Sequence, residues 1–135
     1  LLNAQSVDYN TKKGYAAEGY DVVAYFSTNA KKGSVNYIGI YDSIKYKFSS
    51  KENSEIFMAT PEKFVPQYGG YCAYAMATSG EKVAINPETY ELRDGKLYLF
   101  YKAWGTNTLE SWKKESPQDL IKKADENWKL VKNKK

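Results

Sequence analysis

The chain of 135 residues has the length of one domain, and its 42% hydrophobic and 27% charged residues are typical of a folded protein. The absence of histidine and the presence of one cysteine exclude His-ligated zinc or haem, imidazole catalysis, an internal disulfide and a multi-thiolate metal cage. The net charge of +4 comes almost entirely from dispersed lysines, which disfavours nucleic-acid binding, and no apolar run is long enough to span a membrane.

The first part of the chain predicts one hairpin between polar, turn-forming segments. Residues 1–13 are polar and irregular, and we interpret them as a flexible N-terminal segment. Residues 22–26 predict a short buried strand or turn. Segments 35–41 and 44–48 alternate in hydropathy around an Asp-Ser turn, which predicts two antiparallel strands with lysines on one face of the second.

A helix is predicted directly after this hairpin. Ser49 and Glu52 have the spacing of a capping box, in which a hydroxyl precedes a glutamate by three residues. We expect the helix to reach about Ala59 and to bury Ile56 and Phe57.

The most distinctive segment surrounds the single cysteine, Cys72. Two glycines, Gly69 and Gly70, precede an alanine-spaced run that includes Met76 and ends near Gly80. Alanine favours helix and glycine ends helices, so we predict a short helix that opens close to Tyr71, with a buried strand as the alternative.

A second hairpin and two helices are predicted for the rest of the chain. Asp94-Gly95 between residues 89–93 and 96–101 is the strongest short hairpin signal in the sequence, and residues 83–85 predict an additional strand. A helix is expected at 106–115, and Ser116 caps a second helix whose apolar face contains Leu120, Ile121, Ala124, Trp128 and Val131. The expected fold is a small single α+β domain over residues 14–130, with an antiparallel sheet of two hairpins, flanking short helices and a Lys-rich tail at 131–135.

Several blocks of the sequence, in this order, resemble the YHS domain family. They are Gly19-Tyr20-Asp21-Val22-Val23-Ala24-Tyr25-Phe26, Tyr46-Lys47-Phe48-Ser49-Ser50-Lys51-Glu52-Asn53, Pro61-Glu62-Lys63-Phe64 and Pro66-Gln67-Tyr68-Gly69-Gly70-Tyr71-Cys72-Ala73-Tyr74-Ala75. With the Asp94-Gly95 hairpin, the chain looks like the stand-alone bacterial members, which are usually exported. The resemblance therefore implies a periplasmic or secreted protein. The chain itself has no signal peptide and no initiator methionine, which we interpret as the mark of a processed product.

The resemblance also bears on metal binding. Metal-handling relatives hold soft or transition metals with cysteines at positions that correspond to Ala24, Ser49 and Asn53 here, and Lys47 lies near the place of the namesake histidine. None of these residues carries sulfur, and a soft thiolate is what selects copper(I) or zinc. The inherited thiolate site is therefore missing from this chain.

Cys72 is the one residue with reactive potential. At the start of a helix its thiolate would be stabilised by free backbone N–H groups, and Met76 at i+4 would present a thioether on the same face. Such a pair suits copper(I) or another soft metal but needs a third ligand. The alternative is that both side chains are ordinary core residues.

Tyrosines gather around the same segment. Tyr68, Tyr71 and Tyr74 are candidates for an aromatic ligand site with Cys72 at its floor, and core packing is the alternative. The sequence lacks a phosphate-binding glycine loop, so no nucleotide cofactor is expected, and neither is haem.

Together these features predict a non-enzymatic binding module for a metal ion or a small ligand near Cys72. One alternative is a thiol redox protein in which Cys72 works with an external resolving thiol. Another is a protein-interaction module without a ligand site. The sequence predicts neither the oligomeric state nor the identity of the ligand.

Overall fold

The computed structural model describes residues 6–135, which form one small α+β domain, as the sequence predicts. Its strands are β1 (Thr11–Lys12), β2 (Tyr15–Ala16), β3 (Ser34–Tyr41), β4 (Ile44–Phe48), β5 (Asn86–Arg93), β6 (Lys96–Phe100), β7 (Lys102–Ala103) and β8 (Thr106–Asn107). Its helices are α1 (Ala24–Ser27), α2 (Lys51–Ala59), α3 (Ala73–Thr78), α4 (Thr108–Lys114) and α5 (Pro117–Val131), with 3-10 turns η1 (Ala17–Gly19), η2 (Pro61–Lys63) and η3 (Gln67–Gly70).

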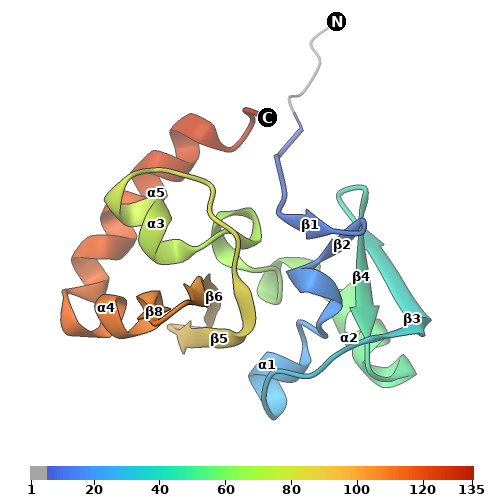
Figure 1. Ribbon diagram of the computed structural model, residues 1–135. Helices are drawn as coiled ribbons and strands as arrows, with labels where there is room; N and C mark the ends of the chain where they lie inside the picture. Colours follow the sequence, from blue (N-terminus) through green and yellow to red (C-terminus); the bar gives the residue numbers. More distant parts are fainter. Residues whose placement is uncertain (1–5) are drawn as a thin grey trace, which may run out of the picture.

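These elements form two groups (Figure 1). β1–β4 with α1 and α2 lie on one side, and β5–β8 with α3, α4 and α5 lie on the other. Each predicted hairpin belongs to one group, so the two hairpins form separate sheets rather than one. No helix among residues 6–135 is long and apolar enough to cross a membrane.

The first group contains a four-stranded sheet in the order β1-β2-β4-β3. β3 and β4 pair antiparallel through Asp42 and Ser43, both with positive φ, which confirms the predicted hairpin and its turn. β2 pairs with β4 in parallel at Tyr15 and Lys45, a contact that no local pattern predicts. The inner face of β4 buries Tyr46 and Phe48, as its alternation predicts.

Helix α2 ends at Ala59 as expected, but its N-cap lies one residue later than predicted. Ser50, not Ser49, is the N-cap, because its hydroxyl accepts the N–H of Asn53 at 3.0 Å. Phe57 is buried as predicted, whereas Ile56 is exposed, so that part of the prediction is wrong.

The second group contains the β5–β6 hairpin, which confirms the Asp94-Gly95 signal. Residues 83–85 form no strand, so the predicted additional strand is wrong. The sequence reading missed the β7–β8 hairpin, whose tip is Trp104 and Gly105. Both predicted helices are present as α4 and α5, and Ser116 caps α5.

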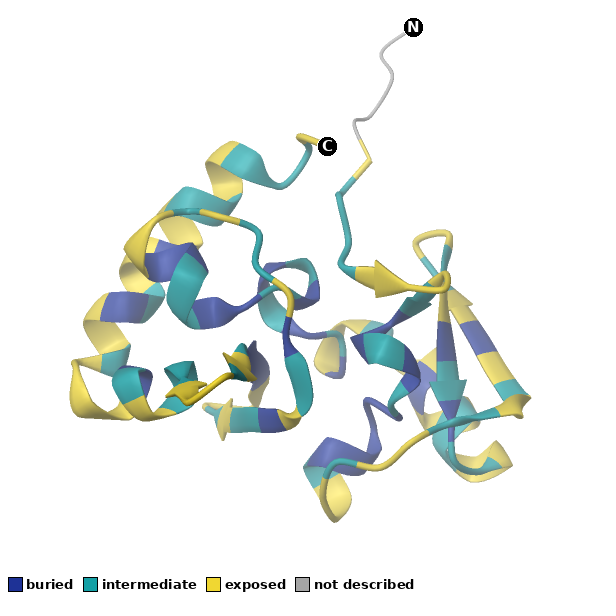
Figure 2. Ribbon diagram, in the orientation of Figure 1, coloured by how far each residue is buried: buried dark blue, intermediate teal, exposed yellow. Residues whose placement is uncertain are grey.

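Strand β6 separates two hydrophobic clusters. Its side chains alternate, with Leu97 and Leu99 packed in the first cluster and Tyr98 and Phe100 in the second. The first cluster lies between the β1–β4 group and β6, and the second lies among β6, α3, α4 and α5. Figure 2 marks the buried residues of both groups in dark blue. Side chains that are close in sequence can therefore belong to different cores.

The N-terminal segment joins the two groups. The N–H of Asp8 donates to the carbonyl of Lys132 at 2.7 Å, and the N–H of Asn10 donates to the carbonyl of Gly69 at 2.9 Å. Residues 8–12 thus contribute to the fold, whereas residues 1–5 of the predicted flexible segment lie outside the described residues. Both described chain ends lie at the same end of the molecule (Figure 1).

Candidate functional site

The positions that the family resemblance associates with thiolates surround a buried carboxylate, Asp21. Oδ1 of Asp21 accepts the backbone N–H groups of Val23 at 2.9 Å and Ala24 at 3.1 Å. These bonds hold the turn that leads into the short helix α1, where the sequence predicted a strand or turn.

The other carboxylate oxygen of Asp21 ties this turn to the start of α2. Oδ2 accepts the N–H of Ser49 at 2.8 Å, the hydroxyl of Ser49 at 2.7 Å and the side-chain amide of Asn53 at 2.8 Å. We call Asp21 with Val23, Ala24, Ser49 and Asn53 the Asp21 centre. Its five hydrogen bonds satisfy a fully buried acceptor internally, so the centre acts as a structural junction.

Cys72 is the N-cap of α3 and is fully buried. Its N–H donates to the carbonyl of Val83 at 2.9 Å, and its Sγ lies 3.4 Å from the Thr108 hydroxyl. That hydroxyl donates its proton to the carbonyl of Tyr101 at 2.6 Å, so the contact assigns the Cys72 thiol as the donor. The sulfur therefore has an internal partner and no exposed surface.

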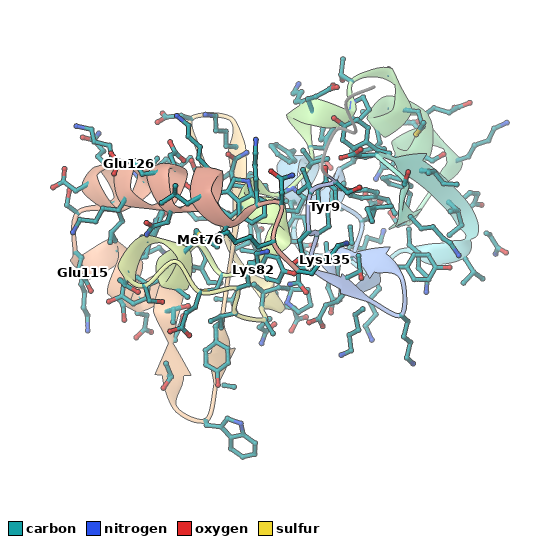
Figure 3. All side chains as sticks on the ribbon, turned by 90° about the horizontal axis from the view of Figure 1, so that it is seen from above. Tyr9, Met76, Lys82, Glu115, Glu126 and Lys135 are labelled. Carbon is teal, nitrogen blue, oxygen red and sulfur yellow. The ribbon has the colours of Figure 1, made fainter. Side chains whose placement is uncertain are left out.

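The predicted shared face of Cys72 and Met76 does not form. Cys72 has φ −57° and ψ 119°, outside the helical range, so the i, i+4 geometry of a helix does not apply to it. Cys72 packs in the first cluster and Met76 in the second, among α3 and α5 (Figure 3). Among residues 6–135 no group of three or more Cys, Asp or Glu side chains is arranged to hold a metal ion.

The three candidate tyrosines point to different partners. Tyr68 donates to Asp125 Oδ1 at 2.8 Å and Tyr74 to Glu115 Oε2 at 2.6 Å, whereas Tyr71 donates to Asp8 Oδ2 at 3.3 Å. Because these acceptors lie on different elements, the tyrosines do not line one pocket above Cys72.

Tyr68 does line an open groove, which we call the aromatic groove. It has a volume of about 460 Å³ and lies between the N-terminal segment, η3 and α5. Its lining consists of Val7, Tyr9, Val65, Pro66, Gln67, Tyr68, Gly69, Asp125, Trp128, Lys129 and Lys132. Tyr9 lies where the two groups of elements meet (Figure 3). Cys72 is not part of this lining.

The two glycines of the distinctive segment adopt positive φ, and Gly69 lies in a tight contact beside the groove. Gly69 has φ +62°, and a Cβ there would lie 2.7 Å from the Trp128 ring and 3.2 Å from the carbonyl oxygen of Asp8. Gly70, at φ +85°, accepts the side-chain amide of Asn10 through its carbonyl at 3.0 Å. Gly69 therefore lets the N-terminal segment and α5 approach η3 closely.

Trp128, which lines the groove, also contacts two residues outside the lining, Tyr71 and Lys82. The rings of Tyr71 and Trp128 lie 6.3 Å apart, and Nζ of Lys82 is 5.9 Å from the centre of each. Lys82 also forms a salt bridge with Asp8 at 2.8 Å. Burial and the Asp8 carboxylate raise the pKa of Tyr71 to about 12, so its hydroxyl stays protonated and bridges to Asp8 at neutral pH.

The groove joins aromatic surface to positive charge. Burial and the Asp125 carboxylate raise the pKa of Tyr68 above its usual value, which keeps this phenol neutral. Lys129 and Lys132 lie on the α5 side, where Asp125 is the carboxylate among the lining residues. Such a surface favours a flat or amphipathic molecule with a negatively charged group.

Sequence reasoning identified Tyr68 but missed most of the groove. Trp128 was expected only as part of an apolar helix face, and Tyr9 was placed in a flexible segment. The signal that was present is the Gly69-Gly70 pair, since adjacent glycines often mark a close approach of another segment.

In comparisons with protein-family models, curated proteins and solved structures, nothing matches this chain. The resemblance to the YHS family therefore stays a prediction that rests on the motifs themselves, and the geometry of the described residues is the basis for any function assigned to the protein.

Proposed function

We propose that this protein is a non-enzymatic binding module whose ligand is a small amphipathic anion with a flat apolar part, held in the aromatic groove. The single observation that carries the proposal is a groove of about 460 Å³ in which aromatic rings and two lysines meet. This volume lies within the range of about 300–1,000 Å³ that is typical of small-molecule sites.

The groove offers two kinds of interaction to one ligand. Tyr9 and Trp128, which are partly exposed, provide ring surface for an apolar group, and Lys129 and Lys132 provide charge for a carboxylate, sulfonate or phosphate. The supporting contacts of Trp128 with Tyr71 and Lys82 favour a preformed site. A preformed site loses less entropy on binding.

This proposal moves the ligand from Cys72 to the groove. The copper(I) site at Cys72 and Met76 and the redox thiol stay predictions, and the burial of both sulfurs gives them no support. The interaction module also stays a prediction. Membership of the YHS family and an exported location belong to the proposal, since both rest on the resemblance of the motifs.

A fluorescent aromatic sulfonate, 8-anilinonaphthalene-1-sulfonate, tests the proposal because it combines the two chemical features. Binding is measured by fluorescence titration for the wild type and for the double variant Lys129→Gln/Lys132→Gln. We expect affinity to fall at least fivefold, which is about 1 kcal/mol, when both charges are removed.

The matched control is Lys122→Gln/Lys123→Gln, which removes the same charge from exposed positions on the same helix, α5. Its affinity should stay within twofold of the wild type, and both double variants should keep the wild-type melting temperature. Equal affinity of the two double variants, or no binding by the wild type, would contradict the proposal.

A further inference from the structure

A second hollow lies on the side of the four-stranded sheet where Lys47 extends. It has a volume of about 380 Å³, and we call it the lysine hollow. Its lining consists of Lys12, Lys13, Tyr15, Glu18, Gly19, Tyr20, Lys32, Lys47 and Pro87. It shares no lining residue with the aromatic groove, so the two sites can be tested separately.

The lysines of this hollow come from three separate parts of the chain. Lys12 and Lys13 lie at the β1–β2 turn, Lys32 precedes β3 and Lys47 lies on β4. These lysines line one hollow because the fold brings their segments together, whereas a run of charge along one element is usually a solvated face. An anion in the hollow would therefore be attracted by lysines from all three parts.

Most of this positive charge has no carboxylate partner. Within residues 6–135, Lys12 is the hollow's one lysine in a salt bridge, with Glu18 at 3.6 Å. Four lysines against one glutamate give the lining a net charge of +3. The lysine hollow is therefore a pocket with a net positive lining.

Lys47 is held in place by its surroundings. Its Nζ lies 4.2 Å from the centre of the Tyr15 ring, and Lys45 reaches the same ring at 5.7 Å. A Cβ on Gly19 would lie 3.4 Å from Cδ of Lys47, and one on Gly33 would lie 2.4 Å from its carbonyl carbon. Gly33 thus allows close packing against the Lys47 backbone, and Gly19 and the Tyr15 ring lie against the end of its side chain.

Tyr20 adds a neutral hydrogen-bond donor to the lining. Burial and the nearby carboxylates of Glu88 and Glu18 raise its pKa above the usual value, so the phenol keeps its proton at neutral pH.

From this geometry we propose that the lysine hollow binds a multivalent oxyanion of the phosphate or sulfate type. Lysine ammonium groups bind such anions as point charges, and several converging lysines suit an anion with more than one negative oxygen. The same chemistry is offered by a soluble phosphate compound and by the headgroup of an anionic lipid, and the experiment below distinguishes these sources.

The test uses two probes, inorganic pyrophosphate and vesicles of phosphatidylcholine with a quarter phosphatidylglycerol. Pyrophosphate binding is measured by calorimetry and vesicle binding by co-sedimentation, at low and at physiological salt. We expect wild-type binding that weakens with salt and falls at least tenfold in Lys32→Gln/Lys47→Gln. Lys13→Gln, at an exposed turn position, is a second variant that leaves the packed Lys47 in place.

The control is again Lys122→Gln/Lys123→Gln, which changes the net charge by the same amount as Lys32→Gln/Lys47→Gln. Pyrophosphate binding that is lost only in the hollow variants supports a soluble oxyanion, and vesicle binding that is lost only in them supports a lipid headgroup. Binding of neither probe by the wild type, or equal weakening in hollow and control variants, would overturn the proposal. Because the aromatic groove keeps all its residues in the hollow variants, its sulfonate binding is expected to remain.

Discussion

Two kinds of region stand out in this molecule, one closed and one open. Asp21 and the Cys72 thiol are fully buried, and each has its hydrogen-bonding capacity used by neighbouring residues. The aromatic groove and the lysine hollow are open, and both are built from segments that are far apart in the sequence.

The difference shows that a distinctive motif does not by itself mark an accessible site. In the Asp21 centre, the residues at the positions that the family resemblance associates with thiolates hold two elements together, and the N–H of Cys72 links α3 to the segment before β5. A buried polar group with satisfied hydrogen bonds stabilises a fold, whereas binding needs surface that remains free.

The largest effect is expected on the closed side, from Asp21→Ala. This change leaves several buried N–H and O–H donors without an acceptor, so we expect a loss of about 3 kcal/mol or more in the free energy of unfolding. Urea unfolding measures the loss. Glu126→Ala, at an exposed position on α5, is the control and should change stability by less than about 0.5 kcal/mol. A loss below about 1 kcal/mol for Asp21→Ala would show that the centre is not a junction.

The second prediction distinguishes the steric contact between Gly69 and Trp128 from the general need for glycine at a positive φ. Gly69→Ala adds a Cβ against Trp128 at a positive φ, whereas Gly95→Ala adds one at φ +76° in open space. The left-handed conformation costs about 1–2 kcal/mol at both positions, and overpacking adds about 1–3 kcal/mol at Gly69 alone. Gly69→Ala should also weaken sulfonate binding. Equal destabilisation of the two variants would argue against the tight contact at η3.

A pH series tests the support behind the groove. The pKa of Tyr71 is raised from 10.0 to about 12 in the fold. The Tyr71 hydroxyl therefore contributes fully to the stability of the folded state below pH 10, and this contribution is lost between about pH 10 and pH 12. At pH 8 the free energy of unfolding of the wild type should be about 1 kcal/mol higher than that of Tyr71→Phe, because of the hydrogen bond to Asp8. This advantage should shrink in urea titrations at pH 11. An advantage that is constant with pH would contradict the assigned contact.

The smallest effect concerns the most exposed aromatic residue. Trp104 is 97% exposed and adopts φ +54° at the tip of the β7–β8 hairpin, next to Gly105. Asn is favoured at this turn position, so Trp104→Asn should raise the free energy of unfolding by about 0.5–1 kcal/mol. Trp104→Ala is the control for loss of the ring alone and should not stabilise the protein. Destabilisation by Asn would indicate that Trp104 has a contact within the fold.

Local signals in the sequence predicted most elements of the fold. Asp94-Gly95 and Asp42-Ser43 placed both hairpins, and Ser116 placed the start of α5, because turns and caps depend on a few adjacent residues. The α2 cap was assigned one residue early because the hydroxyl of Ser49 is used by Asp21, a distant residue.

The open regions were beyond sequence reasoning because they depend on long-range packing. The aromatic groove needs Tyr9, Tyr68 and Trp128 together, and nothing in their local sequence indicates that they meet. The position of Cys72 was predicted to within one residue of a helix start. This difference of one residue matters because an N-cap residue directs its side chain differently from a residue in the first turn, so Cys72 does not share a helix face with Met76.

The most direct test of where this protein binds a ligand is an amide chemical-shift map with 8-anilinonaphthalene-1-sulfonate. Titration into ¹⁵N-labelled protein should shift Gln67 and Gly69 and the indole N–H of Trp128, and leave Cys72 and Thr108 unchanged. Shifts centred on Cys72 and Thr108, with the groove residues unmoved, would contradict the assignment of the groove as the binding site.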